Sequence, residues 1–223
     1  MTATLSRSVE DYLKAIYQLT EGTADAATTE IAQRLDLTPA SVTGMVKRMA
    51  EAGLLEHEPY RGVRLTAQGK TGALAVMRRH RILETYLITQ LGYDWSTVHQ
   101  EAERLEHAVS DELIERMARN LGDPRYDPHG APIPTRDGRI ERPAYQRLAD
   151  MDAGTSVTVR QVGDDDSERL RYLESIGIMP MVELTVLDKA PFGGPLTLRV
   201  AGAEPGERVI GLELAGHLMV ERK

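Results

Sequence analysis

Two short amphipathic stretches joined by a tight turn, with two strand-like runs directly after them, limit the possible fold more than any other feature of the chain. In TTEIAQRLDLTPASVTGMVKRMAEAGLL, residues 28–55, Thr38 is a favourable helix N-cap and Pro39 suits the first position of a helix. The two stretches share apolar residues at helical spacing, namely Ile31, Ala32, Leu35, Val42, Val46 and Met49. The run LLEHEPYRGVRLT, residues 54–66, predicts two strands around a turn. With a further helix expected over residues 8–20, this order of elements predicts a winged helix-turn-helix.

The rest of the chain divides into a helical part and a β-rich part. Residues 67–91 and 96–121 each carry a helical pattern that is long enough to pack against a partner subunit. Five prolines between Gly122 and Pro143 prevent a regular element there and predict a linker or an extended arm. From Thr155 onward, the runs VTVRQV, ELTVLD, LTLRV, RVIGLEL and HLMVE predict five short strands, with one helix over residues 166–177. We therefore expect a mainly α-helical protein with three parts: a winged helix-turn-helix over 1–75, a helical domain over 76–142 with a proline-rich linker at 122–143, and a small C-terminal β-barrel over 150–223.

Composition sets broad limits on the function. The 223 residues are 41% hydrophobic, as in folded domains, and no segment approaches the roughly 20 apolar residues of a membrane span. Cysteine is absent, which excludes disulfides and thiolate ligands and fits a reducing cytosol. The net charge of −7 at first argues against nucleic acid as a partner, but the acidic excess is concentrated toward the C-terminal end. We expect a soluble, cytoplasmic protein.

The stretch VHQEAERLEH, residues 98–107, concentrates histidines and glutamates in a short segment. On a helix, where each residue advances about 100°, His99, Glu103, Glu106 and His107 share one face beside an apolar stripe. These side chains are suitable metal ligands, but a solvent-exposed face with intrahelical ion pairs is the simpler alternative. A metal site therefore needs further ligands from elsewhere in the chain.

Two other segments supply such ligands. His80 and Glu84 in MRRHRILETYL are four residues apart and share a helix face, and His99 can complete a three-ligand set from a neighbouring antiparallel helix. Asp11 on the first helix can join Glu103, Glu106 and His107 in a four-ligand set. In the second set, one ligand belongs to the predicted winged helix-turn-helix.

Several motifs together resemble the diphtheria toxin repressor family of metal-dependent transcriptional regulators, along nearly the whole chain. The matching stretches are SVEDYLKAIYQL, ASVTGMVKRMAEAGLL, YRGVRLTAQGK, MRRHRILETYL, VHQEAERLEHAVSDEL and DPHGAPIP. The C-terminal part is similar to the SH3-like (FeoA-like) domain of that family. The resemblance implies a DNA-binding protein rather than an enzyme, with a metal-binding and dimerisation domain over residues 76–142.

The resemblance also implies two metal sites. The primary site corresponds to Asp11, Glu103, Glu106 and His107, and the ancillary site to His80, Glu84 and His99. Carboxylates of the C-terminal domain are candidates for completing the ancillary site, with a solvated turn as the alternative; they are Asp164, Asp165, Asp166 and Glu168. Lys14 stands where some manganese sensors have a further acidic ligand, so a closely spaced two-metal site of that kind is not expected.

The ligand types favour manganese. The iron-sensing branch of the family has Met and Cys where this chain has Asp11 and Glu103, whereas the manganese-sensing branch has carboxylates at both positions. Hard oxygen ligands favour Mn(II) over softer ions, although zinc affinity stays high because it tends to follow the Irving–Williams order. We expect Mn(II) as the cofactor, with Fe(II) as the alternative and with Zn(II), Co(II) or Cd(II) able to substitute in vitro.

The expected DNA-binding residues lie at the start of the second helix of the helix-turn-helix and in the wing. They are Thr38, Pro39, Ala40, Ser41, Thr43 and Gly44, with Lys47, Arg48, Arg61 and Arg64 as phosphate contacts. The expected partner is double-stranded palindromic operator DNA bound by a homodimer, with no membrane and no small-molecule substrate. The resemblance implies a repressor that uses its metal as corepressor and controls metal-uptake genes.

Two other classes of protein use similar residues. A carboxylate-bridged dimetal enzyme draws its ligands from four long helices, whereas only two long helices carry ligand types here. A winged-helix regulator without metal sensing leaves the histidines as packed or exposed side chains. Abolition of DNA binding by a chelator distinguishes a metal sensor from such a regulator.

Overall fold

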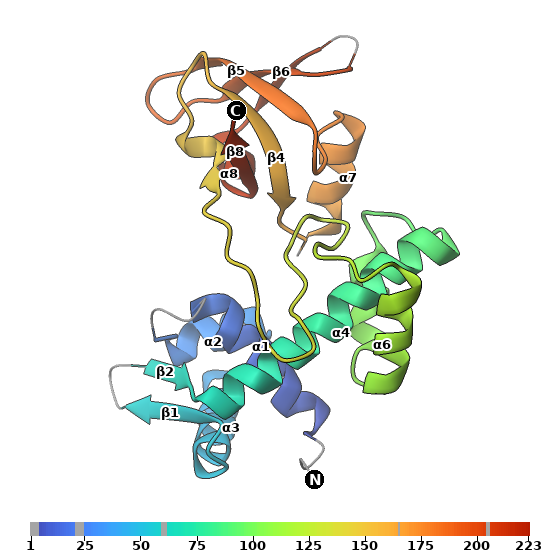
Figure 1. The fold of residues 1–223 in the computed structure, drawn as a ribbon. Coiled ribbons are helices and arrows are strands. Elements are labelled where there is room, and N and C mark those ends of the chain that lie inside the picture. The colour runs from blue at the N-terminus through green and yellow to red at the C-terminus, as the bar shows by residue number, and fades with distance from the viewer. Residues whose placement is uncertain (1–4, 21–24, 59–61, 165, 204–205) are drawn as a thin grey trace. The chain divides into compact units, whose positions relative to one another are not determined.

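The computed structural model describes residues 5–20, 25–58, 62–164, 166–203 and 206–223. Figure 1 shows the helices and strands of the chain with their labels. The chain forms two compact units, each built from separate segments. The first unit contains Met1–His80, Leu105–Asp111 and Pro134–Ile140, and the second contains Arg81–Arg104, Glu112–Ile133 and Glu141–Lys223.

The predicted winged helix-turn-helix is confirmed in the first unit. Its elements are α1 (Arg7–Thr20), α2 (Thr28–Arg34), α3 (Pro39–Glu51), β1 (Leu55–Glu58) and β2 (Gly62–Leu65). Thr38 caps α3, because its side chain accepts a hydrogen bond from the amide of Ser41 at 3.3 Å. The two strands are antiparallel, with Leu55 opposite Leu65. All three helices and both strands contribute to one apolar core, whose fully buried members include Leu13, Ile16, Ile31, Val42, Val46 and Val63.

The long helix α4 (Ala67–Leu91) has the predicted bounds, but the single helix predicted over residues 96–121 is wrong. The structure has two helices there, α5 (Val98–Leu105) and α6 (Asp111–Asn120). Ser110 followed by acidic residues is a helix-start signal inside the stretch, because acidic groups are favourable at a helix N-terminus. Glu106 and His107 therefore lie in the turn between α5 and α6, and this turn belongs to the first unit.

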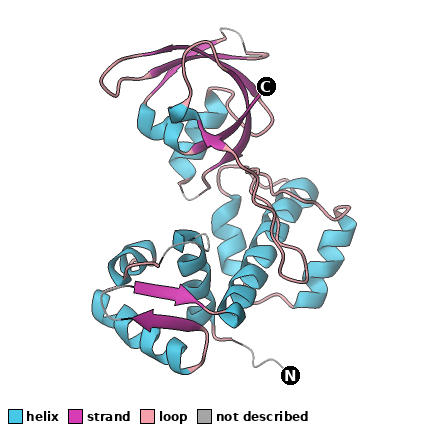
Figure 2. Cartoon of the chain, turned by 60° about the vertical axis from the view of Figure 1, so that its left-hand side comes forward, coloured by secondary structure: helices cyan, strands magenta, loops and turns pink. Residues whose placement is uncertain are grey.

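The C-terminal part of the second unit is an antiparallel sheet with two helices and a short 3-10 turn (Figure 2). The strand order is β3-β8-β4-β5-β6-β7. The elements are β3 (Gln146–Arg147), η1 (Leu148–Asp150), β4 (Ser156–Val162), α7 (Ser167–Ser175), β5 (Glu183–Lys189), β6 (Leu196–Val200), β7 (Glu207–Ile210), α8 (Leu212–Gly216) and β8 (Leu218–Arg222). All five predicted strands are present, but the fourth ends at Ile210 because Gly211 caps α8. The alternating inward side chains of these strands form the second apolar core together with other residues, among them Leu170 and Leu173 of α7.

The segment between α6 and β3 contains no helix among its described residues, as its prolines predict. One tight turn in it is well defined: the Asp127 side chain accepts hydrogen bonds from the amides of His129 and Ala131 at 2.8 and 2.9 Å. In the described part of the chain, no helix has both the length and the apolar character that crossing a bilayer demands.

Candidate metal centre

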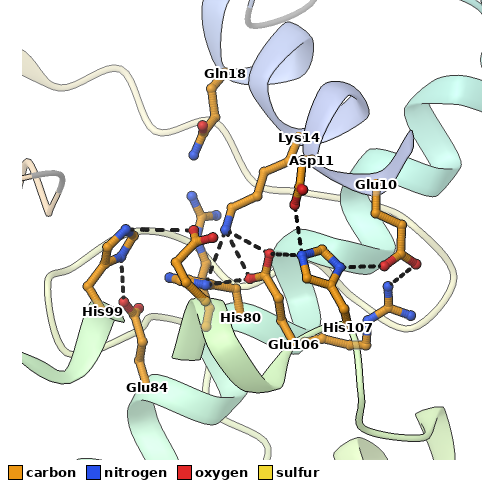
Figure 3. A network of polar contacts seen from close by, with 12 residues as sticks. Glu10, Asp11, Lys14, Gln18, His80, Glu84, His99, Glu106 and His107 are labelled. Atoms are coloured by element: carbon orange, nitrogen blue, oxygen red, sulfur yellow. Dashed lines mark hydrogen bonds and ion pairs between the residues drawn. The ribbon is translucent and has the colours of Figure 1, made fainter. Parts of the chain in front are cut away.

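Three potential metal ligands of the first unit converge on one point. Asp11 comes from α1, and Glu106 and His107 come from the turn after α5 (Figure 3). One ligand atom of each lies within 4.8 Å of the others. The Nε2 atom of His107 is 2.8 Å from Oδ1 of Asp11 and 3.3 Å from Oε1 of Glu106. The fold thus brings helix α1 of the winged helix-turn-helix next to a turn that is about 95 residues away in the sequence.

The environment of His107 Nε2 fits a bound cation. This buried atom has no hydrogen-bond partner among the described residues, although two carboxylate oxygens are close to it. Ligand atoms about 2.1 Å from an octahedral ion are about 3 Å from their neighbours, which matches these separations. Two carboxylates and one imidazole suit hard or borderline divalent ions.

A second cluster occupies the other side of Glu106. The ammonium of Lys14 donates to both carboxylate oxygens of Glu106, at 2.9 and 3.2 Å, and lies 3.2 Å from Nδ1 of His80. His80 Nδ1 is also 2.5 Å from Oε2 of Glu106. Burial alone raises the pKa of Glu106, but the hydrogen bond from His80 and the charge of Lys14 outweigh it and hold that pKa below its usual value. Glu106 is therefore ionised at neutral pH, as a metal ligand must be.

Two residues near this cluster were not among the predicted site residues. Glu10, on α1, is 2.6 Å from Nδ1 of His107, the ring atom opposite the candidate ligand atom. Arg79 of α4 donates to the other oxygen of Glu10. Helical spacing gave no sign of either residue, because their partners come from separate segments of the chain.

The second unit holds another group of potential ligands. Glu84, His99 and Asp164 each offer an atom within 4.8 Å of the others, and Glu84 is fully buried. His99 Nδ1 is 3.1 Å from Glu84 Oε1, and Glu103 Oε1 is 3.7 Å from His99 Nε2. His80, the third residue of the predicted ancillary set, precedes Glu84 by one turn of α4 and belongs to the first unit.

The other predicted carboxylates of the C-terminal domain have different positions. The Asp166 side chain caps α7 by accepting from the amides of Glu168 and Arg169, and these hydrogen bonds lower its pKa. Glu168 lies in the first turn of α7, where the negative charge of a carboxylate interacts favourably with the helix dipole. Asp165 lies outside the described residues. Among the described residues of this acidic run, only Asp164 belongs to a group of potential metal ligands.

A buried network beside Glu84 centres on His129, which the sequence analysis did not single out. His129 Nε2 donates to the carbonyl oxygen of Trp95 at 3.0 Å, and Nδ1 faces Oε2 of Glu84 at 3.8 Å. Burial alone lowers the pKa of His129, but the Glu84 carboxylate and the charge of Asp127 raise it to about 9. Burial and the charge of Glu84 raise the pKa of Asp127 to about 6, against the opposing charge of Arg81.

This network predicts a pH dependence of the metal-free protein. His129 keeps its proton to about pH 9 in the fold, against an ordinary pKa of 6.5, so its stabilisation is complete below about pH 6.5 and is lost as pH rises through 9. The difference between the two pKa values limits this loss to about 3 kcal/mol in the free energy of unfolding. We expect the melting temperature to fall between pH 6.5 and 9, and His129→Gln to flatten this slope. Equal slopes in both proteins would contradict the assignment.

The predicted DNA-binding residues of α3 share its exposed face. The exposed positions are Thr38, Pro39, Ala40, Ser41, Thr43, Gly44, Lys47 and Arg48, whereas Val42, Val46 and Met49 are buried. Space around Gly44 is open, since a Cβ atom there would meet nothing within 4 Å. In the wing, Arg64 is exposed and pairs with Asp25 at 2.6 Å, and Arg61 lies outside the described residues.

Comparison with known proteins agrees with this arrangement. Models of the iron-dependent repressor match the chain in its N-terminal DNA-binding domain (residues 4–63) and its metal-binding and dimerisation domain (residues 66–135), and a FeoA domain model matches residues 146–222. The iron-dependent repressor IdeR of Mycobacterium tuberculosis is 34% identical over 212 residues, which cover 88% of this chain and 90% of that protein. The diphtheria toxin repressor of Corynebacterium efficiens is 34% identical over 192 residues, covering 82% and 84%. The chain belongs to the diphtheria toxin repressor family.

This repressor is also similar to solved structures. A manganese-dependent transcriptional repressor in complex with manganese superposes with a TM-score of 0.90 at 38% identity, covering 96% of this chain and 100% of that one. The family consists of DNA-binding transcriptional repressors, not enzymes, and the predicted fold class is confirmed throughout the chain. The chain is therefore a repressor that depends on a divalent metal and carries a dimerisation domain.

Proposed function

We propose that the repressor uses Mn(II) as its corepressor, with Asp11, Glu103, Glu106 and His107 as the primary ligands. The convergence of two carboxylates and one imidazole on a single point carries this proposal. A ligand set without sulfur favours a hard ion. Fe(II) is the second candidate, because the similar IdeR protein is iron-dependent, whereas the similar solved repressor contains manganese.

The position of Asp11 suggests how the metal controls DNA binding. Asp11 lies on α1, which is held in the winged-helix core by Leu13 and Ile16. Glu106 and His107 lie in the turn between the two helices that follow α4. When bound, the ion supplies a positive charge that these ligands share, so it ties the DNA-binding part of the chain to the dimerisation part. Neutralised carboxylates also repel DNA phosphate less.

The proposed target is a palindromic operator bound by a homodimer. Two recognition helices, α3 of each protomer, match two half-sites only at a defined separation of about one helical turn or a multiple of it. The small exposed side chains of α3 make modest direct contacts with bases, so DNA shape contributes much of the specificity. Lys47, Arg48, Arg61 and Arg64 supply phosphate contacts, and binding weakens steeply as salt rises.

We assign three functional parts to the chain. Residues 1–75 bind DNA, residues 76–142 bind metal and dimerise, with residues 122–143 as the linker, and residues 150–223 form the FeoA-like domain. Glu84, His99 and His80 form the proposed ancillary site. Asp164 is its proposed ligand from the C-terminal domain, which the short distances among Glu84, His99 and Asp164 support. Glu168, in the first turn of α7, is the second proposed ligand from this domain.

The decisive test is metal-dependent binding to a duplex selected from a random library by the manganese-loaded protein. We expect Mn(II) to give tight binding and a chelator to abolish it. Asp11→Met should weaken activation by Mn(II) more than activation by Fe(II), Co(II) or Zn(II), because a thioether replaces a hard ligand. Binding that survives chelation would make the chain a regulator without metal sensing, and a wild-type response to Fe(II) alone would favour the second candidate.

A further inference from the structure

We propose that Glu10 is a positioning residue that fixes the tautomer of His107, so that Nε2 is always the ring atom offered to the metal. The inference rests on the proposed function, since it concerns the same site. Two side chains of α1 contact the two ring nitrogens of His107 (Figure 3). Nδ1 is 2.6 Å from Oε2 of Glu10, and Nε2 is 2.8 Å from Oδ1 of Asp11. The His107 side chain is only 7% exposed, so water cannot easily replace either partner.

The hydrogen bond at Nδ1 decides the state of Nε2. An imidazole that ligates a metal through Nε2 carries its one N–H at Nδ1, and Oε2 of Glu10 is placed to accept that hydrogen bond. Nε2 then offers its lone pair on the side where Oδ1 of Asp11 and Oε1 of Glu106 lie, which are the other two candidate ligand atoms. A carboxylate behind a ligating histidine also makes the ring a stronger ligand.

Arg79 keeps Glu10 in place. Its guanidinium donates to Oε1 of Glu10, and both side chains are largely buried, at 14% and 12% exposure. The same guanidinium lies 3.4 Å from Oδ1 of Asp111, whose side chain is 87% exposed. Of these two carboxylates, Glu10 is the one that also contacts His107. This difference provides a matched control for the role of Glu10.

The test compares Glu10→Ala, Glu10→Gln and Asp111→Asn in the full-length chain. Long-range ¹H–¹⁵N NMR of the metal-free protein at mildly alkaline pH reports which nitrogen of His107 carries the proton, and calorimetry reports the Mn(II) affinity. The wild type should show the Nδ1–H form. Glu10→Ala should populate the Nε2–H form and weaken Mn(II) binding by about 10- to 100-fold. Asp111→Asn should match the wild type in both measurements.

Glu10→Gln separates orientation from charge. The amide oxygen of Gln can still accept from Nδ1–H, so this variant should keep the wild-type tautomer while binding Mn(II) at an affinity between those of the wild type and Glu10→Ala. An Nε2–H or doubly protonated ring in the wild type would overturn the inference, as would unchanged tautomer and Mn(II) affinity in Glu10→Ala. Absence of Mn(II) binding in the wild type would instead refute the proposed function, and the NMR result would still decide the role of Glu10.

Discussion

Glu106→Gln is expected to abolish the response of DNA binding to Mn(II) and to destabilise the first unit. Glu106 is fully buried, and its carboxylate meets the candidate ligand atom of His107 on one side and Lys14 on the other. A neutral amide is a poor ligand for a divalent cation, so we expect Mn(II) affinity at the primary centre to fall by at least about 100-fold. The ammonium of Lys14 also loses its buried counter-ion, which costs about 3 kcal/mol.

A second variant separates the loss of the ligand from the loss of stability. Lys14→Met combined with Glu106→Gln removes both members of the buried ion pair, so it should recover much of the free energy of unfolding without recovering the metal response. Glu112→Gln is the control for the charge change, since Glu112 is exposed on α6 and pairs with Arg116. DNA binding by Glu106→Gln that still requires Mn(II) at wild-type concentrations would exclude Glu106 as a ligand.

Gly130→Ala is expected to destabilise the second unit by several kcal/mol. Gly130 has a φ of +86°, and a Cβ atom there would overlap with the carbonyl group of Arg160 on β4. Neither group can move easily, because the neighbouring carbonyl of His129 accepts a hydrogen bond from the amide of Val162 at 2.8 Å. The turn that holds His129 beside Glu84 is thus packed directly on β4. A Cβ atom at residue 130 would force this turn and β4 apart, which removes the contacts between them.

Gly154→Ala provides the matched control for this prediction. Gly154 also has a φ of +86° and lies in the same unit, but a Cβ atom there would meet nothing within 4 Å. It carries only the strain of a left-handed alanine, about 1 kcal/mol. Denaturant unfolding measures both variants. Equal losses of stability would mean that backbone strain alone matters and that the contact between the turn and β4 is unimportant.

Local patterns predicted the elements of this fold well. The apolar periodicity of residues 67–91 gave the bounds of α4, and the alternation within VTVRQV and LTLRV gave β4 and β6. Such patterns succeed because each element buries one face, which the spacing of its apolar residues records. They failed at residues 106–110, because helical spacing of apolar residues continues there through a turn, and Ser110 marks the start of a new helix.

The candidate site was predictable only in part. The ligand types in the 98–107 stretch indicated a metal site, and Asp11, Glu106 and His107 do lie together. Their assignment as ligands stays a prediction. The partners Glu10, Arg79 and His129 escaped prediction because their roles depend on contacts between distant segments, such as α1 with the turn after α5. No local pattern records which nitrogen of a histidine faces which carboxylate.

The account depends on coupling between metal occupancy and DNA binding, and one thermodynamic measurement tests it most directly. Mn(II) affinity is measured by calorimetry for the wild type and for Asp11→Asn, each with and without the selected operator duplex. Because linkage is reciprocal, the wild type should bind Mn(II) at least about tenfold more tightly when DNA is bound, whereas Asp11→Asn should show little difference. Equal Mn(II) affinities of the wild type with and without DNA would contradict the account.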